Sequence, residues 1–178
     1  MAGFLLRSLS LVLALVLMAL PVEAARDTDS YDGNIFALYA GNGSLVPPAT
    51  TLADSQAAGR TSVLVYYLDD SSSSKIFSAS VSEIQRVWGR SVDLLPLTTD
   101  ALQNRGDQGL SDPAHYWKGV VPQVVVLDGS GSVILDANGQ VPLEEINAAI
   151  SAATGIPAPA GGSTSLSFNE LNTEVISR

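Results

Sequence analysis

Residues 66–77 read YYLDDSSSSKIF and join two elements of different kinds. The run that leads into them, residues 61–68, combines β-branched and aromatic side chains without polar alternation, which is the pattern of a strand buried on both faces of a sheet. After the serines, four apolar side chains recur at spacings of four, three and four residues: Phe77, Val81, Ile84 and Trp88. This spacing predicts an amphipathic helix over residues 75–88. The chain therefore places four serines between a central strand and a helix.

A β-hairpin followed by a helix is predicted near the end of the domain. Residues 123–127 and 132–136 are short apolar runs on either side of a DGSG turn, which favours two antiparallel strands. Residues 141–155 then form a helical pattern, with Pro142 in its first turn and Gly155 as its C-cap. The side chains expected to face the core from this helix are Leu143, Ile146 and Ile150.

The remaining predicted elements are a strand at residues 35–40, a helix at 47–59, a strand at 91–97 and a short helix at 100–104. Pro48 and Gly59 bound the first helix, and Pro96 is expected to end its strand because proline has no N–H for the ladder. The order of strands and helices implies an α/β fold with a central mixed sheet and helices on both faces.

The N-terminal segment has the pattern of an export signal. Arg7 precedes an apolar run from Leu9 to Leu20, and the small-residue motif VEA ends at Ala24. The run is 12 residues long, whereas a membrane-spanning helix needs about 20. We therefore expect residues 1–24 to be a cleaved signal peptide, with an uncleaved membrane anchor as the alternative.

A linker and a separate small unit are predicted after the domain. Residues 156–165, IPAPAGGSTS, have the Pro/Gly/Ser composition of a flexible linker. Residues 166–178 begin with a capping-box pattern and place three apolar side chains at helical spacing: Phe168, Leu171 and Val175. This predicts a short amphipathic contact helix, which docks either on its own domain or on a partner.

Composition excludes several classes of function. The chain has no cysteine, so thiol–disulfide chemistry and Cys-based metal sites are excluded, and no cofactor or metal is expected. Its formal net charge of −9 argues against nucleic acid as a partner, because binding the phosphate backbone depends on basic side chains. A content of 46% hydrophobic residues is sufficient for one globular domain with a core.

The strand, the serines and the proline before the hairpin together resemble a thioredoxin domain over residues 34–155. In that family, an apolar strand leads into a Cys-x-x-Cys pair that opens a helix, and a cis-proline begins a later strand. Ser71 and Ser74 occupy the positions of the two cysteines, and Pro122 occupies that of the cis-proline. The resemblance implies a thioredoxin-like fold without redox chemistry and a cis bond between Val121 and Pro122.

The serines have a structural interpretation and a functional one. A helix N-terminus lowers the pKa of a thiol, but a serine hydroxyl gains no comparable ionisation there, so capping of the free N–H groups is the favoured role. The functional interpretation is a binding module that keeps the peptide-docking groove of the family. The expected groove residues are Asp70, Ser71, Ser72, Ser74, Val121 and Pro122, with Tyr116 and Trp117 nearby.

Four longer strings carry a closer resemblance: LYAGNGSLVPP, YYLDDSSSSK, YWKGVVPQVVVLDGSG and GQVPLEEINAAI. Together they resemble the cyanobacterial photosystem I accumulation factors of the thylakoid membrane, which are thioredoxin-like proteins without a full redox pair. This resemblance implies an assembly or stability factor in the thylakoid lumen or at the thylakoid membrane. The implied partners are photosystem I subunits or their assembly factors, and membrane association would use the N-terminal segment.

Two other functions remain open on the sequence alone. The first is a hydrolase that uses one of residues 71–74 with His115, although the chain has no G-x-S-x-G motif. The second is an exported solute-binding domain. Asp69 and Asp70 do not form a catalytic carboxylate pair unless the strand has ended before them, because adjacent strand residues point to opposite faces.

Overall fold

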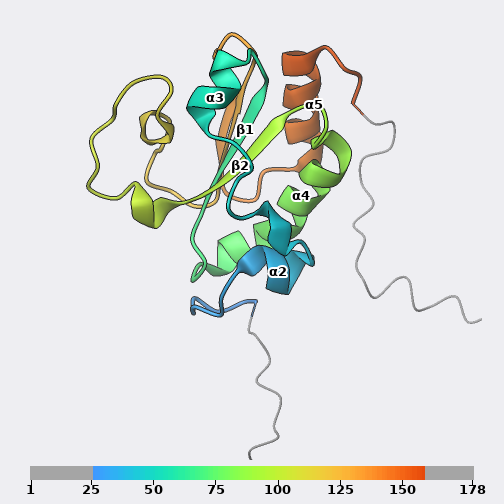
Figure 1. Cartoon of the computed structure of the whole chain (residues 1–178). Helices are drawn as coiled ribbons and strands as arrows, with labels where there is room; N and C mark the ends of the chain where they lie inside the picture. Colours follow the sequence, from blue (N-terminus) through green and yellow to red (C-terminus); the bar gives the residue numbers. More distant parts are fainter. Residues whose placement is uncertain (1–25, 159–178) are drawn as a thin grey trace, which may run out of the picture.

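A computed structural model describes residues 26–158, and the predicted signal segment and C-terminal helix lie outside these residues. The regular elements are α2 (Ile35–Ala40), α3 (Leu52–Ala57), β1 (Ser62–Tyr67), α4 (Ser72–Trp88), β2 (Asp93–Thr98), β3 (Gln123–Leu127), β4 (Val133–Asn138) and α5 (Leu143–Thr154). Figure 1 shows α4 and α5 on one side of the sheet, and α3 with the long loop after β2 on the other. Within residues 26–158, no helix is both long enough and apolar enough to span a membrane.

The sheet is mixed, with the strand order β2–β1–β3–β4. β1 runs parallel to β2 and antiparallel to β3, and β3 pairs antiparallel with β4. A parallel β1–α4–β2 unit and a β3–β4 hairpin followed by α5 are thus joined in one sheet, which is the thioredoxin-like arrangement. All six residues of β1 are buried, as the unbroken apolar run predicted. The Val121–Pro122 peptide bond before β3 is cis, as expected.

Two clusters of buried apolar side chains lie on the two faces of the sheet. Alternate residues of the central strands point to opposite faces, so Val63 and Val65 face one cluster while Leu64 and Tyr66 face the other. The first cluster, which we call the helix face, includes the apolar sides of α2, α4 and α5. The second, the loop face, is completed by Leu52 of α3 and by side chains of the β2–β3 loop, residues 99–122.

The long helix α4 confirms the predicted apolar face. The buried apolar side chains along it are Phe77, Val81, Ile84 and Trp88. The helix begins at Ser72, three residues before the predicted start, because Ser71 has an extended backbone and its hydroxyl caps the first turn. Trp88 also donates a hydrogen bond from its indole nitrogen to Oδ1 of Asn147, at 2.8 Å, which joins α4 to α5.

The hairpin and the last helix agree with the sequence. β3 has the predicted bounds, and β4 lies at residues 133–138. The turn between the strands is held by Asp128, whose carboxylate accepts from the backbone N–H groups of Ser130 and Ser132. Gly155 ends α5 in a left-handed conformation.

The strand predicted at residues 35–40 is wrong, because these residues form the helix α2. Oδ1 of Asn34 accepts hydrogen bonds from the N–H groups of Phe36 and Ala37, at 3.0 and 3.2 Å. Gly41 then ends the helix with φ of 61°. Ile35 and Phe36 are buried against α4 instead of extending the sheet.

Three other predicted boundaries also change. The helix expected at residues 47–59 is only α3, because Thr51 accepts a hydrogen bond from the N–H of Asp54 and sets a later start. Pro96 lies inside β2 and does not end it. Proline is tolerated there because β2 is an edge strand, and an edge strand has no neighbour on one side that would need its N–H groups. The helix expected at residues 100–104 is a 3-10 turn, Thr99–Ala101.

Candidate functional site

The serines at residues 71–74, which we call the serine junction, contact the end of the β2–β3 loop before Pro122, which we call the proline loop. Ser71 accepts a hydrogen bond from the N–H of Ser74 at 3.4 Å, and the hydroxyls of Ser71 and Ser73 lie 2.9 Å apart. Ser73 donates from its hydroxyl to the carbonyl of Val121, also at 3.4 Å. The N-terminus of α4 therefore contacts the residue that precedes Pro122.

Ser74 has a structural role. Its hydroxyl accepts a hydrogen bond from the N–H of Leu68, at 3.2 Å, and its side chain is buried. Leu68 directly follows β1, so this contact ties the end of the strand to the first turn of α4. The hydroxyl satisfies a backbone donor that has no ladder partner.

An aspartate from the N-terminal segment occupies the first turn of α4. Asp29 accepts a hydrogen bond from the N–H of Ser72 at 2.8 Å. This hydrogen bond lowers the pKa of Asp29 below its usual value, because a free N–H at a helix N-terminus stabilises negative charge. The chain thus supplies its own carboxylate to a position that would otherwise attract an anion.

The N-terminal segment is held by a buried lysine that the sequence analysis missed. We call residues 26–32 the strap. The Lys75 side chain has 0% exposure, and its Nζ donates to the Thr28 carbonyl at 3.0 Å, to the Ser30 hydroxyl at 3.3 Å and to Oδ2 of Asp32 at 2.5 Å. Burial of this charge is compensated because the donors are paired.

Tyr39 of α2 completes this contact. Its hydroxyl donates to Oδ2 of Asp32 at 2.7 Å. The hydrogen bond from Lys75, followed by that from Tyr39, lowers the pKa of Asp32, and the same carboxylate raises the pKa of Tyr39 to about 12. The signal in the sequence is weak: Thr28, Ser30 and Asp32 are polar, but the Thr28 contact is made by its backbone carbonyl, which no side-chain pattern predicts.

Asp69 and Asp70 follow the end of β1, so the strand geometry that would have separated them no longer applies. Oδ1 of Asp69 accepts from the N–H of Ile35 at 3.4 Å, at the start of α2. Burial raises the pKa of Asp69, and the like charges of Asp100 and Asp70 add to this effect. Asp70 is exposed and directly precedes Ser71 in the chain.

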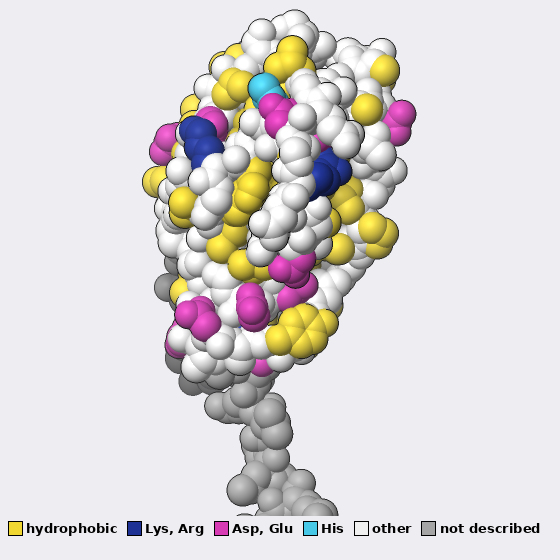
Figure 2. Space-filling view, turned by 90° about the vertical axis from the view of Figure 1, so that its left-hand side faces the viewer, with side chains coloured by type: hydrophobic (Ala, Val, Ile, Leu, Met, Phe, Trp, Pro, Cys, Tyr) yellow, Lys and Arg dark blue, Asp and Glu magenta, His cyan; other side chains and the backbone are white. Residues whose placement is uncertain are grey.

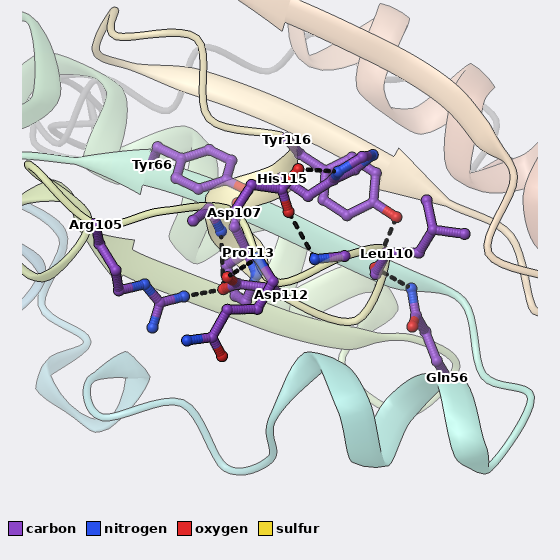
Figure 3. A network of polar contacts seen from close by, with 12 residues as sticks. Gln56, Tyr66, Arg105, Asp107, Leu110, Asp112, Pro113, His115 and Tyr116 are labelled. Carbon is purple, nitrogen blue, oxygen red and sulfur yellow. Dashed lines mark hydrogen bonds and ion pairs between the residues drawn. The ribbon is translucent and has the colours of Figure 1, made fainter.

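Tyr116 and Trp117 belong to the loop face, whereas the serines lie at the N-terminus of α4. Tyr116 is buried, and its hydroxyl donates to the carbonyl of Leu110 at 2.8 Å. Trp117 packs on Tyr66, with ring centroids 5.3 Å apart. Figure 3 shows Tyr116 and Tyr66 beside the β2–β3 loop. Tyr116 and Trp117 therefore support the loop that leads to Pro122.

A polar network holds the β2–β3 loop (Figure 3). The buried carboxylate of Asp112 accepts from Arg105 and from the N–H groups of Gln108 and Ala114. The Tyr66 hydroxyl donates to the carbonyl of Pro113 at 2.7 Å. These contacts take the place of a regular helix over this part of the sheet.

Gln123 joins the same loop to the hairpin. Its Nε2 donates to the carbonyl of Tyr116 at 2.8 Å and to Oδ1 of Asp136 at 2.9 Å, and its Oε1 accepts from the N–H of Lys118 at 3.1 Å. Gln123 directly follows Pro122 and is fully buried. The loop is therefore fixed at both sides of the groove proline.

His115 contacts Asp107 and Tyr116 instead of the serines at residues 71–74. Its Nδ1 lies 2.7 Å from Oδ2 of Asp107, and its ring packs edge-on against Tyr116. A backbone N–H from Gly109, followed by the His115 contact, lowers the pKa of Asp107. Within residues 26–158, His115 makes no hydrogen bond to any of residues 71–74, so this histidine and these serines do not form the nucleophile–base pair of a serine hydrolase.

The surface on the side of the β2–β3 loop mixes hydrophobic, polar and acidic side chains. Figure 2 shows hydrophobic side chains between stretches of polar and backbone atoms, with acidic side chains gathered toward the lower part. Among the described residues, no group of three or more His, Asp or Glu side chains is arranged to hold a metal ion.

One known relative covers most of the chain. The thylakoid membrane protein slr1796 of Synechocystis sp. is 38% identical over 156 residues, which are 86% of this chain and 77% of that protein. No protein-family model matches the sequence.

Two solved structures show more distant similarity. A redox protein from Chlamydomonas reinhardtii has a TM-score of 0.46 and 14% identity, over 82% of this chain and 41% of that one. An HIV epitope scaffold has a TM-score of 0.36 and 18% identity, over 66% of this chain and 71% of that one.

Proposed function

Because the chain belongs to the family of the thylakoid membrane protein slr1796, we propose that it acts at the thylakoid membrane as a non-redox accumulation or assembly factor for photosystem I. It does so by binding protein: photosystem I subunits or their assembly factors. The N-terminal segment provides export toward the lumen or attachment to the membrane.

The observation that carries this proposal is the contact between the N-terminus of α4 and the loop before Pro122, in a chain that has no thiol. Ser71 and Ser74 occupy the cysteine positions, and the chain has no cysteine elsewhere. The Ser73–Val121 contact nevertheless keeps the N-terminus of α4 against the proline loop. An arrangement of this kind without a thiol is suited to binding and not to disulfide exchange.

Backbone recognition is the mode of binding that this groove supports. The N–H of Val121 makes no hydrogen bond within the described part of the chain, and the residue is half-buried. An extended segment of a partner would accept from this donor, in the way that a strand is added to a sheet edge. Asp70, Ser71 and Ser72 then line the other side of the bound segment.

The photosystem I part of the proposal rests on the four sequence strings quoted above. Three of them lie at the groove or beside it: YYLDDSSSSK carries the junction, YWKGVVPQVVVLDGSG carries the proline loop, and GQVPLEEINAAI begins next to it. Gln140 in the last string donates to the carbonyl of Ser73 at 2.8 Å. The resemblance is therefore concentrated on residues that surround the same groove.

The test is capture of partners by the full chain in a cyanobacterial host, with the bound proteins identified by mass spectrometry. Val121→Arg places a long charged side chain in the groove, and Leu110→Arg is the matched control at an exposed apolar site of the loop. We expect photosystem I proteins with the natural chain and with the control, and a loss of at least about tenfold with Val121→Arg.

In the same host, Val121→Arg should lower the photosystem I content measured by P700 absorbance, while photosystem II stays unchanged. Both variants are checked by thermal melting, so that a folding defect is recognised. Absence of photosystem I proteins from the captured set, or unchanged capture by a folded Val121→Arg chain, would contradict the proposal.

A further inference from the structure

The two edges of the sheet differ in how they are protected. The edge strand β2 contains Pro96 in its middle, and Leu94, Leu95 and Pro96 are buried. The edge strand β4 contains no proline, and its first two residues are exposed: Val133 by 50% and Ile134 by 40%. Natural sheets usually protect an edge with proline, with charge or with a covering element, and β4 has the least of this protection.

The backbone of β4 has an open side. In residues 26–158 this strand pairs only with β3, so its other side carries N–H and C=O groups without a strand partner. Helix α5 packs on one face of the hairpin, where Leu135 and Ala137 join the helix face of the core. It covers the face of the strand and leaves the edge unpaired.

The charge along β4 is already neutralised. Asp136 is the one ionisable residue of the strand, and its Oδ2 lies 2.7 Å from Nζ of Lys118 while Oδ1 accepts from Gln123. The chain as a whole is strongly acidic, with a net charge of −9. Two copies would therefore repel each other over most of their surface, but not along this strand.

We propose that β4 pairs antiparallel with β4 of a second copy of this chain, so that the two sheets become continuous. A strand that pairs antiparallel with its own copy satisfies a two-fold axis, because a residue that pairs with a second residue of the copy is matched by the reciprocal pair. The pairing would connect the open backbone groups and cover Val133 and Ile134. Six paired residues span about 20 Å, which is a small interface, so the dimer forms weakly and reversibly.

The first measurement is sedimentation equilibrium of the full chain without its signal segment, over a dilution series of about a hundredfold. We expect the average mass to rise toward that of a dimer with concentration, and to rise further at higher salt because screening weakens the repulsion between acidic copies. A chain that stays monomeric over the whole series overturns the proposal.

The second measurement places the interface on β4. Ile134→Lys adds a charge beside the paired strands, and Leu110→Lys adds the same charge at an exposed apolar site of the β2–β3 loop. We expect Ile134→Lys to weaken dimerisation at least about tenfold and Leu110→Lys to leave it unchanged. A dimer that is insensitive to Ile134→Lys, or equally sensitive to both changes, overturns the proposal.

The absence of cysteine allows a direct test of proximity. Ile134→Cys introduces a unique thiol in each copy, and antiparallel pairing of β4 places the two thiols on neighbouring strands, within reach of a short bis-maleimide cross-linker. With this cross-linker, we expect covalent dimers from Ile134→Cys and far fewer from Leu110→Cys. Equal yields from the two variants would show random collision and overturn the assignment.

Discussion

On one face of the sheet, three helices pack apolar side chains against the central strands; on the other, a helix of six residues and a long loop cover it. The helix face is held by apolar packing, with Phe77, Ile84 and Ile146 fully or almost fully buried. The loop face depends more on polar contacts to Asp112, Gln123 and two tyrosine hydroxyls. A loop held by such contacts opens locally more readily than a packed helix, because water can replace its hydrogen bonds.

The largest expected effect is a cavity on the helix face. Phe77→Ala should lower the free energy of unfolding by about 3 to 5 kcal/mol, whereas Leu102→Ala on the loop face should cost about 2 kcal/mol because the loop can collapse around the lost volume. Urea denaturation followed by circular dichroism measures both. Equal costs for the two changes would remove the contrast between the faces.

The buried lysine tests how far the strap belongs to the helix face. Lys75→Met removes the donor to Thr28, Ser30 and Asp32 and should cost about 2 to 3 kcal/mol, because charge-assisted hydrogen bonds are lost and Asp32 is left without its cation. Amide exchange should accelerate over residues 26–32. Arg86→Met, which breaks an exposed ion pair with Glu83, is the control and should cost far less, because exposed ion pairs contribute little to stability. Similar costs for both would mean that the strap adds nothing.

The next largest change in stability is expected for the serines at the start of α4. Replacing Ser71 and Ser74 by Ala should cost about 1 to 2 kcal/mol, since one caps the helix and the other accepts from Leu68. Ser80→Ala, inside the helix, should have no such cost. If the double variant melts like the natural chain but no longer captures partners, the hydroxyls act in binding and the capping role is wrong.

The polar network of the loop face should have a smaller global effect. Asp112→Ala leaves the donors of Gln108 and Ala114 without their acceptor, yet the loop can expose them to water, so we expect a cost of about 1 kcal/mol. Amide exchange should nevertheless increase strongly over the β2–β3 loop. Asp107→Ala, at an exposed carboxylate of the same loop, should change less. A cost equal to that of Phe77→Ala would show that the loop unfolds with the core.

The smallest expected effect is a slight increase in stability, for a change at Asp69. Burial raises the pKa of Asp69, so its folded pKa lies above its unfolded pKa, and stability is lost as the pH rises through the folded value. Asp69→Asn keeps an acceptor for Ile35 without the charge. It should therefore stabilise the protein slightly near pH 7 and have no effect below about pH 3.9, the ordinary value for aspartate. Destabilisation at both pH values would mean that the carboxylate is needed in its ionised form.

Much of the central architecture could be predicted from local patterns. The bounds of β3 and the apolar face of α4 follow directly from the sequence, because the period of buried positions is set by the geometry of each element. Residues 35–40 are the counterexample. A six-residue apolar run fits a strand and a buried helix equally, and the signals that decide between them are the flanking Asn34 and Gly41, which cap the helix.

The candidate site also has features that the sequence predicts and features that it does not. The serine junction and Pro122 could be located by resemblance, because the motif and its spacing are local features of the chain. The contacts of Asp29 and Lys75 could not, since 43 residues separate each from its carboxylate or amide partner. A polar segment before the first element is equally compatible with a solvated tail.

The sequence by itself determined that the chain has no thiol chemistry, that a central strand leads into a capped helix, and that a hairpin and a helix end the domain. These features depend on composition and on neighbours a few residues apart. Only the tertiary structure decided that a strap pairs with a buried lysine, that His115 lies away from the serines, and that β4 is an open edge. Those outcomes depend on which distant groups share a desolvated space, where an unpaired charge or backbone donor is costly and a partner must be found.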